Sequence, residues 1–201
     1  AIAVVIAAAS SGLYPRIKSG EVLFKEALII SGLGAVANIG AAQIVKNISD
    51  SILITGFSAV IIFAALTMLR TPVQAPEKKI SLPTLILLSL IIGSLTGFFG
   101  IGGGFLAIPV LVLAFNTSQN KAAGTSLMVI VLNSVIALLA HQSSWNQINW
   151  KVPLFMAISA IIIGQLAGKK SATTNPVLLR KSFAALLFSI AAFTIIETWV
   201  L

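Results

Sequence analysis

The sequence predicts an all-α fold, a polytopic transmembrane helical bundle. Hydrophobic residues make up 58% of its 201 residues and charged residues 9%, whereas soluble domains carry roughly 25% charged residues. The apolar residues occur in continuous runs, and a bilayer crossing needs about 20 such residues. They do not alternate with polar residues, as the strands of a membrane barrel do. Cysteine is absent, which excludes a disulfide scaffold and thiolate metal sites.

Five runs have the length of a membrane crossing: 27–45, 51–69, 122–140, 152–168 and 183–201. Residues 1–14 form a shorter run with no initiator Met and no preceding basic segment, which is typical of a helix entered part-way and not of a signal peptide. Residues 82–115 are 34 uncharged residues, divided by Gly100-Ile101-Gly102-Gly103-Gly104 into arms of about 18 and 11 residues. We therefore expect seven or eight membrane segments, with a Gly-broken helix pair or a re-entrant hairpin in 82–115.

Lys and Arg residues set the expected orientation, because cytoplasmic loops carry an excess of them. If residues 82–115 enter and return, segments 15–26, 70–81, 116–121 and 169–182 share one side and hold 11 of the 13 basic residues. If 82–115 crosses once, the division becomes 7 against 6 and the bias disappears. We therefore expect these four loops to be cytoplasmic and the C-terminus to be external.

A weak internal repeat emerges when the sequence is shifted by 126 residues: Val22 then coincides with Ile148, and Phe57 with Phe183. The simpler alternative is that all apolar helices resemble one another. Because the matched loops would lie on opposite sides, the two halves are expected to have inverted topology, a common transporter plan. The repeat predicts an N-terminally incomplete chain in three regions: residues 1–69 as a first repeat lacking its glycine segment, 70–81 as a cytoplasmic linker and 82–201 as a complete second repeat.

Three consecutive glycines, Gly102 to Gly104, predict a helix break, because glycine is costly inside a helix. Broken backbone at membrane depth is tolerated only where it is buried in protein or lines a watery cavity. The half-helix that follows points free N–H groups at the break, which suits a small anion, and Pro109 would bend this second arm further. Gly93 and Gly97 fit the GxxxG pattern instead, and we expect them to serve close helix packing.

A second group of small and hydroxyl residues follows a short loop, in Lys121-Ala122-Ala123-Gly124-Thr125-Ser126-Leu127. Thr125 and Ser126 have hydroxyls that would donate hydrogen bonds to an oxyanion, and helix capping with close packing is the equal alternative. Asn133 and Ser134 lie deeper in the same run, where polar side chains either pair across helices or line a pathway.

The glycine segment and the later run together form the pattern GxxxGxxGIGGGFLxxPxL followed by AxGTSL. The residues that carry this pattern are Gly93, Gly97, Gly100, Ile101, Gly102, Gly103, Gly104, Phe105, Leu106, Pro109, Leu111, Ala122, Gly124, Thr125, Ser126 and Leu127. The combination resembles the TauE/SafE sulfite exporter family of membrane transporters. The resemblance implies movement of sulfite, organosulfonates or related small anions across the inner or plasma membrane, by a protein with two such repeats.

The sequence thus predicts a multi-pass plasma-membrane permease or exporter of small anions, with the lipid bilayer and the anion as partners. The expected substrate-binding residues are Gly100, Gly102, Gly103, Gly104, Pro109, Gly124, Thr125, Ser126 and Asn133. An intramembrane enzyme is disfavoured, because one His, no Cys and no buried acid supply no nucleophile–base pair. We expect no catalytic residue, metal or cofactor, and no nucleic-acid partner, since the basic residues form no stripe. A homo-oligomer stays open, and the alternative function is a non-transporting scaffold or an inactive fragment.

Overall fold

The computed structural model describes residues 2–45, 48–70, 81–99, 104–140 and 151–199, and all regular structure within them is helical. The eight helices are α1 (Ile2–Lys18), α2 (Phe24–Ile44), α3 (Asp50–Arg70), α4 (Leu82–Phe99), α5 (Gly104–Phe115), α6 (Gln119–Ala140), α7 (Lys151–Thr173) and α8 (Pro176–Trp199). Five of them, α2, α3, α4, α6 and α8, are long and apolar enough to cross a membrane. The chain is therefore a multi-pass membrane protein, as its composition predicts.

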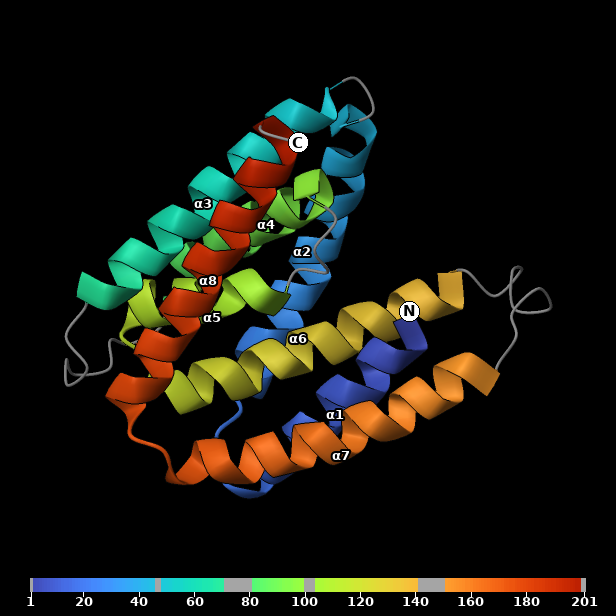
Figure 1. Ribbon diagram of the computed structural model, residues 1–201, viewed down its shortest axis with the longest axis vertical. Coiled ribbons are helices and arrows are strands. Elements are labelled where there is room, and N and C mark those ends of the chain that lie inside the picture. Colours follow the sequence, from blue (N-terminus) through green and yellow to red (C-terminus); the bar gives the residue numbers. More distant parts are fainter. Residues whose placement is uncertain (1, 46–47, 71–80, 100–103, 141–150, 200–201) are drawn as a thin grey trace.

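The helices form two groups that meet at α5 and α6 (Figure 1). In one group α1 lies between α6 and α7, and in the other α2 packs along α4 while α3 packs along α8. The short helix α5 packs mainly on α6 and also contacts α3 and α4. Leu106, Ala107 and Leu111 of α5 are buried in a cluster that joins side chains of α2, α4 and α6. The second arm of the segment therefore packs into the protein core.

Residues at the helix ends explain where α1 ends and where α8 begins. Helix α1 ends at a turn in which Gly20 has a φ of +68°, a conformation that favours glycine. The N–H of Glu21 then donates to the carbonyl of Arg16, at 2.9 Å. Helix α8 begins with Pro176 as its first residue, and the side-chain oxygen of Asn175 accepts the N–H of Val177 at 2.8 Å.

The expected break in 82–115 is confirmed, because α4 ends at Phe99 and α5 begins at Gly104. Its arms of 18 and 12 residues match the expected lengths. The expected loop at 169–182 is wrong in extent: α7 continues to Thr173 and α8 begins at Pro176. Its four basic residues therefore lie within α7 and α8, near the end of the one and the start of the other.

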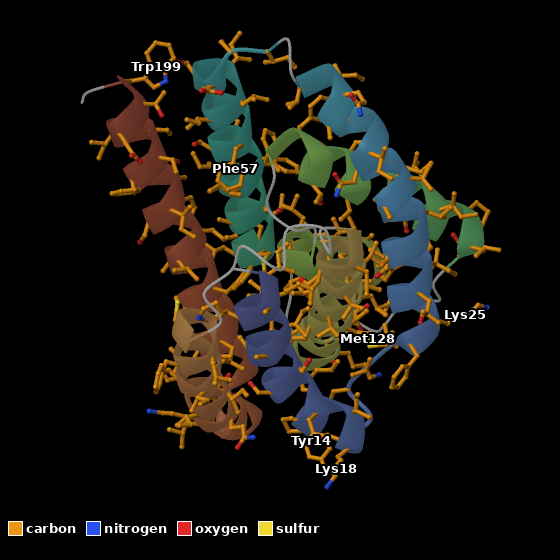
Figure 2. All side chains as sticks on the ribbon, turned by 90° about the vertical axis from the view of Figure 1, so that its right-hand side faces the viewer. Tyr14, Lys18, Lys25, Phe57, Met128 and Trp199 are labelled. Atoms are coloured by element: carbon orange, nitrogen blue, oxygen red, sulfur yellow. The ribbon has the colours of Figure 1, made fainter. Side chains whose placement is uncertain are left out.

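Contacts between helices fix their relative directions. Gly34 on α2 lies against Gly93 on α4, and Asn38 one turn later lies against Gly97, so these two helices run in the same direction. Helices α3 and α8 run in opposite directions, since Ser58 bonds to Thr194 while Thr55 bonds to Trp199. Figure 2 shows Trp199 at one end of the molecule and Tyr14 with Lys18 at the other.

Candidate functional site: the broken helix and the cavities beside it

The break lies between the end of α4 and the start of α5. Gly100, Gly102 and Gly103 lie outside the described residues, Gly104 is the first residue of α5, and Pro109 is buried within that helix. A helix rises about 1.5 Å per residue, so the 12 residues of α5 extend about 18 Å, short of the roughly 30 Å hydrocarbon core of a bilayer. Helix α5 is therefore too short to cross a bilayer alone, and Leu106 and Ala107 in its first turn are buried.

Glycine packing holds α4 against α2 up to the break. A Cβ atom on Gly93 would collide with the backbone of Gly34, and one on Gly97 would collide with the carbonyl oxygen of Asn38 and with the side chain of Ala41. Neither position has room for a side chain without moving backbone. This confirms the packing role expected for Gly93 and Gly97. The approach also fixes Asn38 one turn from the position where α4 ends.

The start of α6 holds the turn between α1 and α2. Gly124 lies against the backbone of Glu21, where a Cβ atom would collide. The hydroxyl of Thr125 accepts the N–H of Leu23 at 3.1 Å and donates to the carbonyl of Lys121 at 2.7 Å. The geometry thus gives Gly124 and Thr125 a packing and bonding role. Their contact with substrate stays a prediction.

Arg16 joins the same junction, and sequence reasoning missed it as a functional residue. One guanidinium nitrogen donates to the carbonyl of Asn120 at 2.9 Å and lies 3.2 Å from a carboxylate oxygen of Glu21. Burial lowers the pKa of Arg16, which lies beyond the apolar run 1–14, and the Glu21 carboxylate opposes that shift. Arginine stays charged in proteins. The pair therefore ties the α1–α2 turn to the first turn of α6, and both segments lie on one side of the molecule.

Two open cavities lie between helices of the described part of the chain. The first, about 400 Å³, lies between the second halves of α2 and α6, and its lining includes the amides of Asn38, Gln43 and Asn133. The second, about 300 Å³, lies between α3 and α4 and is lined by Asp50 and by aromatic rings that include Phe57 (labelled in Figure 2) and Phe99. The rings of Phe57 and Phe99 pack against each other with their centroids 5.5 Å apart.

The predicted site residues fall into separate places. Ser126 is buried at 1% exposure and Asn133 lies seven residues, or about two turns, further along α6 on the same face. Thr125 and Asn133 are about 12 Å apart along the helix axis, so the hydroxyl group and the amide do not form one cluster. Asn38 was missed as a site residue. Its signal was an amide inside an apolar run, which at membrane depth indicates a pathway or a pairing.

The sulfite exporter TauE/SafE family model matches residues 1–194. The chain belongs to this family. Relatives named probable membrane transporter proteins occur in two strains of Xylella fastidiosa, and both are 26% identical to this chain. The match to the first covers 90% of this chain and 72% of the relative. The match to the second covers 97% of this chain and 77% of the relative. Another, from Methanocaldococcus jannaschii, is 37% identical over 46% of this chain and 36% of its own length. No solved structure matches the chain. The TauE/SafE chain is thus a member of a family of membrane transporters.

Proposed function

We propose that this TauE/SafE chain is a plasma-membrane permease or exporter of small anions, with sulfite, sulfonates and related sulfur-containing anions as its substrate class. The observation that carries the proposal is the short helix α5, which begins at Gly104, the last of the three consecutive glycines, and shares a buried cluster with side chains of α2, α4 and α6. Such a helix start offers backbone N–H groups and partial positive charge to an anion. The family description supports sulfite as the first substrate to test.

The helix positions support the proposed two-repeat organisation of a transporter. Helices α3 and α8 begin at Asp50 and Pro176, which are 126 residues apart, and α2 and α7 begin at Phe24 and Lys151. These starts agree with the shift at which the sequence partly matches itself. Inverted repeats place the substrate site at the repeat interface, where discontinuous helices meet. The division into residues 1–69, 70–81 and 82–201 remains part of this proposal.

Sulfite flux into proteoliposomes tests the proposed function. Gly103→Leu would place a bulky side chain at the break, and we expect it to abolish flux while the protein still inserts. Gly40→Leu is the matched control, because Gly40 is exposed and a Cβ atom there meets nothing within 4 Å. Flux at the wild-type rate in Gly103→Leu would contradict the assignment to the break. No flux of sulfite or of a panel of other small anions in the wild type would favour the scaffold alternative.

A further inference from the structure

We propose that the cavity between α2 and α6 is a second binding site for the transported anion, on the pathway beside the break, and that the amides of Asn38 and Asn133 bind its oxygens. The inference rests on the proposed function and adds to it a position, a residue pair and a mode of recognition. Asn38 and Asn133 come from different helices and line the same cavity of about 400 Å³. That volume accommodates a small oxyanion together with water.

The position of the cavity connects it to the break. The backbone of Asn38 is in contact with Gly97, and α4 ends two residues after Gly97, at Phe99. The Asn38 side chain belongs to the cavity lining while its backbone is held by α4. A change in the position of the α4 end would therefore move one wall of the cavity. This couples the proposed binding site to the segment that the proposed function makes the centre of transport.

The described lining is neutral: three amide residues stand among Ala and Ile side chains. The side-chain oxygen of Asn133 is buried and has no hydrogen-bond partner among the described residues. A buried acceptor without a partner costs free energy, so this position favours the other orientation of the amide, in which its N–H donors take the place of the oxygen. Each amide has two N–H donors and one acceptor, and rotation about its terminal bond chooses which faces the cavity. Two amides in one lining can thus bind several oxygens of a small anion.

The charges around the two cavities favour the α2–α6 cavity as the anion site. None of the described residues that line the α2–α6 cavity is charged, so an anion meets dipoles and no fixed countercharge. Transport requires binding that is favourable enough for entry and weak enough for exit, and neutral dipoles meet both demands. The other cavity contains the carboxylate of Asp50 beside apolar aromatic rings. Like charge disfavours an anion there.

Substitution of the two amides tests the site through the concentration dependence of sulfite flux. We expect Asn38→Leu and Asn133→Leu to raise the KM for sulfite about tenfold or more, since charge-assisted hydrogen bonds are lost. Asn133→Asp keeps the shape of the side chain and should also weaken binding, because its carboxylate repels the anion. Gln165→Leu is the control, since Gln165 is an exposed amide on α7. Thermal unfolding in detergent with and without sulfite measures binding apart from flux.

The outcomes separate this inference from the proposed function. The site is supported if the wild type transports sulfite while Asn38→Leu and Asn133→Asp show a raised KM. Both variants should also lose the rise in unfolding temperature that sulfite causes in the wild type. If the wild type transports sulfite and the folded variants Asn38→Leu and Asn133→Asp have an unchanged KM, the proposed site is wrong and the proposed transport function stands. Absence of both flux and sulfite-induced stabilisation in the wild type, with the full anion panel, overturns the proposed function and the site with it.

Discussion

At the scale of single residues, glycines in this chain differ by what they face. Gly93 and Gly97 let α4 touch the backbone of α2, whereas Gly32 and Gly40 on α2 have nothing within 4 Å of an added Cβ atom. The GxxxG spacing predicts the first role, because residues four apart lie on the same face. The partner was not predictable from sequence. Gly34 supplies it, and only the docking of two helices shows which residue that is.

Gly93→Ala is expected to destabilise the protein by about 1–3 kcal/mol, because the new methyl collides with the Gly34 backbone. Gly40→Ala is the matched control. It is expected to be neutral or to stabilise by about 0.5–1 kcal/mol, since alanine is the better helix former. Unfolding by SDS titration in mixed micelles measures both. Equal stability of the two variants would contradict the close packing of α4 on α2.

Thr125→Val is expected to destabilise by about 1–3 kcal/mol, because it leaves the N–H of Leu23 without its acceptor inside the protein. Thr198→Val is the control, since the hydroxyl of Thr198 bonds to the carbonyl of Thr194 in its own helix, and it should change stability by less than about 0.5 kcal/mol. The same titration compares them. A Thr125→Val variant as active and as stable as the wild type would show that the hydrogen bond between the α1–α2 turn and α6 does not stabilise the protein.

At the scale of helices, hydrophobic length predicted most of the elements, and the glycine triplet predicted the division between α4 and α5. The failure at 169–182 has a physical cause, since charged residues end an apolar run without ending a helix. The position of the α2–α6 cavity depends on how these two helices dock on each other. Sequence reasoning selected Asn133 but not Asn38, because no local pattern encodes which residues of distant helices line the same cavity.

Paired cysteines test the packing of α3 on α8 in a protein that has no cysteine of its own. The hydroxyls of Ser58 and Thr194 lie 2.9 Å apart, so we expect Ser58→Cys with Thr194→Cys to crosslink under mild oxidation. Ser51→Cys with Thr194→Cys is the control, because Ser51 lies two turns further along the same face of α3, beyond the reach of a disulfide. Peptide mass mapping detects the bond. A crosslink in the control alone would contradict this helix pairing.

At the scale of the whole molecule, the contacts among helices and the distribution of basic residues lead to the same arrangement by independent routes. Charge counting groups segments 15–26 and 116–121 on one side. The hydrogen bond of Arg16 to Asn120 brings those segments together without reference to charge bias. The parallel course of α2 and α4 then places the starts of both helices on that side, and the connection between α2 and α3 on the other.

Single cysteines decide which side is cytoplasmic. Ser19, Asn175 and Ser49 are exposed and lie between helices. We expect Ser19→Cys and Asn175→Cys to react with a membrane-impermeant maleimide only after cells are permeabilised, and Ser49→Cys to react in intact cells, because the basic side faces the cytoplasm. Labelling of all three after full denaturation controls for expression. Reaction of Ser19→Cys and Ser49→Cys from the same side would contradict a membrane crossing by α2. The fully reversed pattern would keep the fold and invert the orientation, so that the end of α4 and the amide cavity would face the cytoplasm.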